Sequence, residues 1–175
     1  MTTQSYHFEL GNFKCIVIRD GEHKGSAEFI FCNAPQDDVA QILQKYKLEA
    51  DQLGSSWTCL LVDTGERTLL IDTGVGSGVP IGGRLIGQLE EAGYPTDSID
   101  MIFLTHGHPD HIGGCTDING KLVFKNAHYV MGKTEYEFWT SDENLSKLEG
   151  MMVQSAQNNL PIIQEQIQLV SGTDE

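Results

Sequence analysis

An apolar run followed at once by a cluster of histidines sets the strongest limit on how this chain can fold. Residues 101–104, Met-Ile-Phe-Leu, are typical of a buried strand, and Thr-His-Gly-His-Pro-Asp-His-Ile-Gly-Gly follows directly at residues 105–114. Side chains two positions apart in an extended segment point the same way. His106 and His108 can therefore converge on one metal ion where the strand ends.

The residues after Pro109 extend this predicted site. The chain is expected to turn there, so that Asp110 and His111 reach a second position nearby, and a glycine pair at 113–114 lets the backbone bend tightly. Imidazole is the commonest side-chain ligand for transition metals, and carboxylate can join it. A histidine-rich surface loop satisfied by water is the alternative, but the order of strand, HxHxDH and Gly-Gly favours metal. The predicted ligands are His106, His108, Asp110 and His111.

The same residues carry a family resemblance. The HxHxDH motif after a strand resembles the signature of the metallo-β-lactamase superfamily, and Leu-Leu-Ile-Asp-Thr-Gly at residues 69–74 resembles that family's strand ending in Asp-Thr-Gly. Residues 120–127 and 135–139 are similar to the branch that holds N-acyl homoserine lactonases and methyl parathion hydrolase-like enzymes. The likeness covers nearly the whole chain and is strongest over residues 57–139.

The resemblance implies an α/β fold of the α+β sandwich type. We expect the N-terminal half of the metallo-β-lactamase αβ/βα fold, with a mixed sheet and helices on one face, as a single domain over residues 1–175. Family members complete a two-metal site with a later histidine, a bridging aspartate and a final histidine. None of the six histidines lies after His128, so the C-terminal half of the fold is expected to be absent. His128 and Cys115 are weaker candidates for additional ligands.

The resemblance also implies a metal-dependent, di-zinc hydrolase, although iron, manganese or cobalt suit the same donors. A bound metal lowers the pKa of water from about 15.7 to about 7, and that water would attack a lactone, ester or phosphotriester. Asp110 is the candidate catalytic residue, which would orient the water or carry a proton to the leaving group. The chain alone is expected to be inactive without the later ligands. The alternative is a non-hydrolytic member, either a di-iron oxygen or nitric oxide reductase or a scaffold.

Other residues receive more limited assignments. Asp72 could accept a hydrogen bond from a ligand imidazole, as residues behind metal ligands commonly do, or it could cap backbone amides in a turn. Tyr136 and Phe138 are candidates for a substrate pocket, whereas Trp139 is expected in the core. The glycine-rich stretch at 74–83 lacks the Lys-Ser/Thr ending of a phosphate loop, so we expect a loop at the rim of the site.

Periodicity and turn residues predict the order of the elements. A hairpin of strands 57–62 and 67–71, buried on both faces, is followed by a helical crossover to strand 101–104. The helix that starts at 141 is expected to bury Leu145, Leu148, Met152 and Ala156. The remaining strands are expected at 13–18, 28–31, 121–124 and 129–131, and the other helices at 37–48 and 84–92.

Charge and composition exclude several classes of partner. A formal net charge of -14 opposes binding to nucleic acid, and no apolar stretch approaches the roughly 18 residues of a membrane span. A small-molecule substrate remains. The N-terminus resembles no secretory signal and the four cysteines form no disulfide framework, so we expect a cytoplasmic protein. A half-fold would expose apolar sheet surface, which predicts association, for example as a homodimer.

Overall fold

The computed structural model describes residues 5–172, which build one seven-stranded mixed sheet whose strands follow one another in chain order. The pairs from β1 to β4 are antiparallel, and the pairs from β4 to β7 are parallel. The strands are β1 (Ser5–Leu10), β2 (Phe13–Gly25), β3 (Leu53–Asp63), β4 (Thr68–Ile71), β5 (Met101–Leu104), β6 (His128–Gly132) and β7 (Ile167–Val170).

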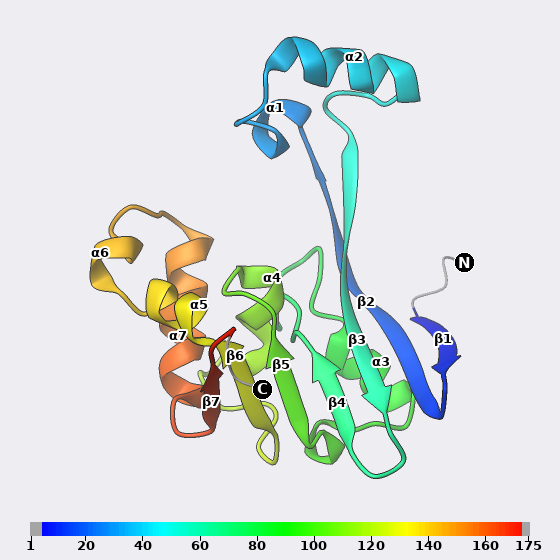
Figure 1. The fold of residues 1–175 in the computed structure, drawn as a ribbon, viewed down its shortest axis with the longest axis vertical. Coiled ribbons are helices and arrows are strands. Elements are labelled where there is room, and N and C mark those ends of the chain that lie inside the picture. The colour runs from blue at the N-terminus through cyan, green and yellow to red at the C-terminus, as the bar shows by residue number, and fades with distance from the viewer. Residues whose placement is uncertain (1–4, 173–175) are drawn as a thin grey trace.

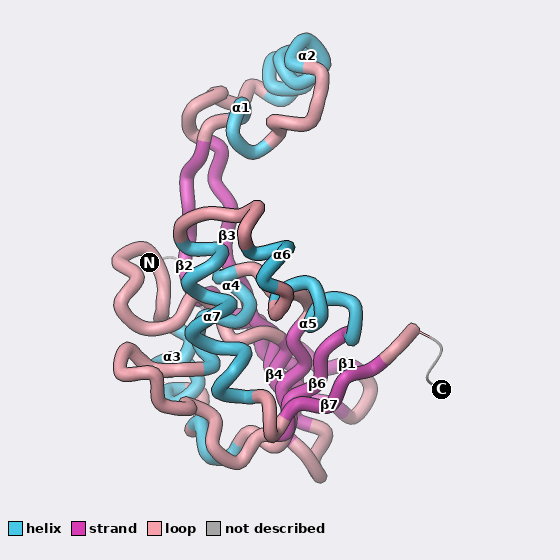
Figure 2. Tube along the Cα trace, turned by 90° about the vertical axis from the view of Figure 1, so that its left-hand side faces the viewer, coloured by secondary structure: helices cyan, strands magenta, loops and turns pink. Residues whose placement is uncertain are grey.

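Helices cover one face of this sheet and its carboxyl edge (Figure 2). Two short 3-10 turns, Thr96–Ser98 and Gly113–Cys115, lie between them in sequence. Among residues 5–172, no helix is long and apolar enough to cross a membrane. The helices are α1 (Ala27–Ile30), α2 (Gln36–Tyr46), α3 (Leu85–Glu91), α4 (Pro109–Ile112), α5 (Lys133–Trp139), α6 (Asp142–Leu145) and α7 (Met151–Ile163).

The core lies between this helical layer and one face of the sheet. Ile16, Leu61, Leu70, Ile102 and Tyr129 are register partners across five strands, and none is more than 3% exposed. Because side chains alternate along a strand, this row faces one side of the sheet only. The mixed sheet with helices on one face confirms the predicted fold class.

The other face of the sheet corrects one expectation. The hairpin of β3 and β4 and the parallel crossover through α3 to β5 are present as predicted. Burial on both faces is wrong, because Phe103 is 39% exposed and its register partners Ile71 and Val130 are only half-buried.

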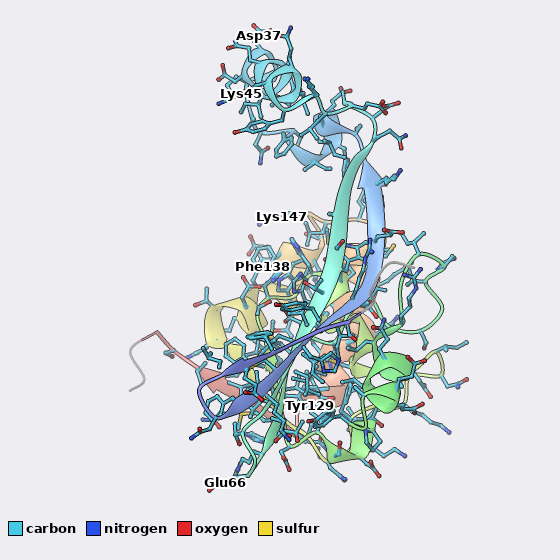
Figure 3. The ribbon with its side chains drawn as sticks, turned by 90° about the vertical axis from the view of Figure 1, so that its right-hand side faces the viewer. Asp37, Lys45, Glu66, Tyr129, Phe138 and Lys147 are labelled. Atoms are coloured by element: carbon cyan, nitrogen blue, oxygen red, sulfur yellow. The ribbon has the colours of Figure 1, made fainter. Side chains whose placement is uncertain are left out.

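A long hairpin of β2 and β3 forms an arm that carries α1 and α2 away from the body (Figure 1). Figure 3 places Asp37 and Lys45 at its far end, whereas Tyr129 lies in the body. The strand expected at 13–18 is longer than predicted, because a bulge between Arg19 and Gly21 lets β2 continue to Gly25. The strand expected at 28–31 is instead helix α1, whose first turn is capped where the Ser26 hydroxyl accepts the Phe29 N–H.

Two further expectations fail beyond the histidine motif. Residues 121–124 form no strand; only an isolated bridge pairs Leu122 with Thr116, because the Asp117 carboxylate turns the chain by accepting the backbone N–H groups of residues 119 and 121. The helix expected from 141 is two helices, α6 and α7, because Gly150 adopts a φ of 62° between them.

Candidate metal centre

The carboxyl edge of β4 and β5 brings two separate parts of the motif together. The strands are parallel, with Ile71 beside Phe103, and the N–H of Asp72 donates to the carbonyl of Phe103 at 2.9 Å. Asp72 and Thr105 therefore leave the sheet side by side, at the edge where open α/β sheets commonly bind ligands.

Three imidazoles cluster at this edge. The ring centroid of His106 lies 4.5 Å from that of His108 and 3.8 Å from that of His111. Pro109 opens α4 at its first helical position, where the missing N–H costs nothing. The helical turn places Asp110 Oδ2 3.4 Å from His111 Nε2. All four residues predicted as ligands thus lie in one cluster.

Asp72 makes both of the contacts considered for it. Its Oδ2 accepts a hydrogen bond from His111 Nδ1 at 2.8 Å, and its Oδ1 accepts the backbone N–H of Thr105 at 2.8 Å. The Thr105 hydroxyl also lies within 3.0 Å of both Asp72 oxygens and of His106 Nδ1. Asp72 adopts a φ of 64°, a region that Asp and Asn enter more easily than most residues. Asp72 is 5% exposed, and its carboxylate orients the imidazole of His111.

The surroundings of the cluster shift the pKa values of His111 and His106 in opposite directions. Burial tends to lower the pKa of His111, but the hydrogen-bonded carboxylates of Asp110 and Asp72 raise it from 6.5 to about 9. Burial and the neighbouring imidazoles of His111 and His108 lower the pKa of His106. Burial tends to raise the pKa of Asp110, but its contact with His111 lowers it. A cation bound to Nε2 of His111 would replace the proton that these carboxylates favour.

Close backbone packing holds the motif against the preceding loop. The N–H and hydroxyl of Thr73 both donate to the His111 carbonyl, at 2.8 and 2.9 Å. A Cβ on Gly114 would lie 2.1 Å from the carbonyl oxygen of Thr73, and one on Gly113 would lie 2.4 Å from that of Val75. The glycine pair is therefore needed for close approach, in addition to the bend that the sequence predicted.

Asp20 anchors the glycine-rich loop behind the site and was missed by sequence reasoning. It is fully buried, and its carboxylate accepts backbone N–H groups from Val75 at 2.9 Å, Gly83 at 3.3 Å and Leu85 at 2.9 Å. A second residue without a predicted role, Glu135, contacts the backbone of Gly107 inside the motif. The two residues are 28 positions apart in the chain, so no local sequence pattern predicts that contact.

The donor types fit a metal ion, and the coordination shell is not complete. Three imidazoles and the Asp110 carboxylate lie within contact distance at one edge of the sheet, which is the donor set that zinc and related metals take. Within residues 5–172, no three His, Cys, Asp or Glu side chains are arranged to hold one ion. A complete coordination shell therefore requires either rotation of these side chains or additional donor groups.

The other sequence candidates lie elsewhere. His128 begins β6 at the opposite edge of the sheet, where its Nε2 lies 3.4 Å from the amide oxygen of Gln168. Cys115 is fully buried, and burial raises the pKa of its thiol to about 12. Tyr136 packs against the core, Phe138 is 40% exposed beside the indole of Trp139, and Trp139 is 5% exposed in the core. Figure 3 shows Phe138 on the side of the body that carries the arm.

The fold and the cluster together define an α/β protein with a histidine–aspartate site at the carboxyl edge of its sheet. Residues 55–166 match the metallo-beta-lactamase superfamily. The chain belongs to this superfamily, as its motif indicated.

Solved structures agree with this assignment. The chain superposes with a TM-score of 0.85 and 26% identity on "hydrolase AbOPH in beta lactamase superfamily", covering 100% of this chain and 63% of that one. AidC, a dizinc quorum-quenching lactonase in complex with a product, gives a TM-score of 0.83 and 28% identity, covering 98% of this chain and 62% of AidC. The chain therefore spans about three fifths of the length of these structures and shares their fold.

A curated relative matches over a smaller part of its length. The transcription termination factor FttA of Cenarchaeum symbiosum (strain A) is 28% identical over 114 residues, which are 65% of this chain and 16% of that protein. Proteins with different functions thus share similarity to this domain, so the fold alone does not identify a substrate.

Proposed function

We propose that the complete protein is a hydrolase that uses two zinc-type ions to cleave a lactone, an ester or a phosphotriester. The observation that carries this proposal is the contact among the rings of His106, His108 and His111 beside two carboxylates at one edge of the sheet. The likeness to AidC, a dizinc lactonase, supports both the metal and the substrate class.

Each residue of the cluster has a distinct role in this proposal. His106 and His108 hold one ion, and Asp110 with His111 holds the other. Because His111 donates through Nδ1 to Asp72, its Nε2 is left to bind metal, so Asp72 sets the tautomer. Iron, manganese or cobalt could take the place of zinc at the same donors.

Such ions, when bound, act as Lewis acids and lower the pKa of a water molecule to about 7. The chain itself supplies the groups that orient this water and move its proton. Asp110 is partly exposed, and the lowered pKa of its carboxyl keeps it ionised at neutral pH. It can therefore accept a hydrogen bond from the water and carry a proton to the leaving group. Phe138, 40% exposed at the end of α5, is the better placed of the two pocket candidates.

We expect a small molecule, and not a nucleic acid, as the substrate. The formal net charge of -14 repels a nucleic acid backbone, which argues against the kind of partner that the name of FttA suggests. The four cysteines are unpaired, which supports a reducing, cytoplasmic location. Exposed sheet side chains such as Phe103 support self-association of the isolated chain.

The proposal is tested on the complete protein by loading it with zinc and assaying an N-acyl homoserine lactone, an aryl ester and a phosphotriester. Activity on at least one of them should vanish with a chelator and return with metal. Asp110→Asn should lower kcat by about 100-fold or more, which is the usual contribution of a group that moves a proton. Asp37→Asn, an exposed change on α2, is the matched control and should leave kcat unchanged.

Two results would overturn the proposal. Full metal occupancy without turnover of any of the three substrates would rule out the proposed hydrolase activity. Bound iron that consumes oxygen, with no hydrolysis, would instead favour the redox alternative.

A further inference from the structure

Helix α5 approaches the histidine motif from the neighbouring strand. Strands β5 and β6 are parallel, with Leu104 beside Met131. The residues that follow each strand therefore leave the sheet at the same edge. Since α5 begins at Lys133, directly after β6, its first turns lie against the residues that follow β5.

One carboxylate oxygen of this helix joins two donors. Glu135 Oε2 accepts the backbone N–H of Gly107 at 3.2 Å and the indole N–H of Trp139 at 2.9 Å. Glu135 and Trp139 are four residues apart, so they lie on the same face of the helix. Gly107 lies between His106 and His108 in the chain, so the carboxylate binds the backbone at the centre of the predicted ligand pair.

The indole packs as closely as the backbone allows. Trp139 is 5% exposed. Its ring lies edge-on to that of His108, with the ring centroids 5.5 Å apart and an interplanar angle of 84°. A Cβ on Gly107 would lie 2.2 to 2.4 Å from three atoms of the indole, so only a hydrogen fits between them. Trp139 therefore packs both against the backbone at Gly107 and against the ring of His108.

We propose that Glu135 and Trp139 are positioning residues that hold His106 and His108 in the geometry needed to bind one ion. The inference rests on the metal site proposed above and deepens it. The charge-assisted hydrogen bond fixes the peptide at Gly107, and it also satisfies the indole N–H, which would be costly to bury without a partner. Neither residue touches the reacting atoms; both act through the ligands.

The test compares Glu135→Ala with Glu137→Ala in the complete protein. Glu137 lies on the same helix, is exposed, and forms an ion pair with Lys133 at 3.7 Å. Zinc affinity is measured by competition with a coloured chelator, and the environment of the site by the visible absorption of bound Co²⁺. Glu135→Ala should bind zinc about 10-fold to 100-fold more weakly, as expected for a residue that orients a ligand, and should change the Co²⁺ spectrum. Glu137→Ala should match the wild type in both.

A conservative variant separates positioning from general packing. Glu135→Gln keeps a side-chain oxygen that can accept both hydrogen bonds, so it should recover most of the affinity lost in Glu135→Ala. Trp139→Phe removes the indole N–H but keeps an aromatic ring beside His108, and it should shift the Co²⁺ spectrum. Should Glu135→Ala fail to fold, Trp139→Phe decides the question by the same two measurements.

The outcomes distinguish this inference from the proposed function. A wild-type protein that binds neither zinc nor Co²⁺ would overturn the metal site itself. A wild type that binds both, with Glu135→Ala and Trp139→Phe indistinguishable from it, would overturn only the positioning role.

Discussion

The carboxyl edge of the sheet and the arm formed by β2 and β3 are built in opposite ways (Figure 1). At the edge, Asp72 and Thr73 make hydrogen bonds to residues more than 30 positions away, and glycine backbones touch. In the arm, Phe29 is 77% exposed, Tyr46 is 62% exposed, and Val39 is the one residue of α2 that is buried.

The difference shows where this fold can tolerate change. Long-range hydrogen bonds and close backbone contacts restrict a group from several sides at once, so a change at one contact disturbs the others. An exposed arm depends mainly on the pairing of its own two strands. We therefore expect substitutions at the edge to alter stability and metal binding together, and substitutions in the arm to alter neither.

Two glycines give the largest expected contrast. A Cβ on Gly114 would lie 2.1 Å from a backbone carbonyl oxygen, whereas one on Gly54, in the arm part of β3, would meet nothing within 4 Å. Gly114→Ala should lower the free energy of unfolding by about 3 kcal/mol, at the upper end for overpacking because a backbone atom cannot rotate away. Gly54→Ala should change it by less than about 0.5 kcal/mol. Urea denaturation measures the free energy of unfolding of both variants. Equal losses would contradict the difference expected between the edge and the arm.

A pair of aspartates tests the edge more finely. Asp72→Asn keeps a side chain that tolerates the φ of 64° but loses the charge that faces His111, so zinc affinity should fall about 10-fold to 100-fold. Asp100 is the control, since its carboxylate accepts the N–H of Thr68 at 2.7 Å, at the start of β4 and away from the histidines. Calorimetric titration of Asp100→Asn should reproduce the wild-type affinity. Tight zinc binding by Asp72→Asn would argue against its role.

The pH dependence of the metal-free protein gives a smaller effect. The pKa of His111 is raised from 6.5 to about 9, so the stability it contributes is complete below pH 6.5 and is lost as the pH rises through about 9. The pKa of His106 is lowered, so its contribution is lost as the pH falls below about 6.5. Melting temperature measured in chelator should therefore peak near pH 6.5 and decline toward pH 9. His111→Gln should lack this decline toward pH 9, because the titrating imidazole is gone. A wild type without the decline would contradict the raised pKa of His111.

The smallest effect is expected at the end of the arm. Phe29→Ser replaces an exposed ring in α1, so it should change the free energy of unfolding by less than about 0.5 kcal/mol and leave zinc affinity unchanged. Denaturation and titration check the two parts of this expectation. A loss of several kcal/mol would mean that the arm is covered in solution and is less independent than its exposure indicates.

Local sequence patterns were enough to predict much of the fold, and to predict that the four candidate ligands lie close together. The hairpin of β3 and β4, the crossover through α3, and strand β6 were predicted because each has a strong periodicity and clear turn residues. The strand expected at 28–31 failed because its apolar residues lie at the end of an arm with no neighbouring strand to pair with, and Ser26 caps a helix there instead.

By itself, the sequence determined which residue types meet: three imidazoles and an aspartate at the end of a buried strand, with glycines where the backbone must bend. Only the tertiary structure decided what holds them. Asp20 and Glu135 act on backbone groups 55 to 65 and 28 positions away in the chain, and no local pattern encodes such a distance. A short motif can specify its own donors, but the partners that orient those donors are brought to it by the packing of separate strands and helices.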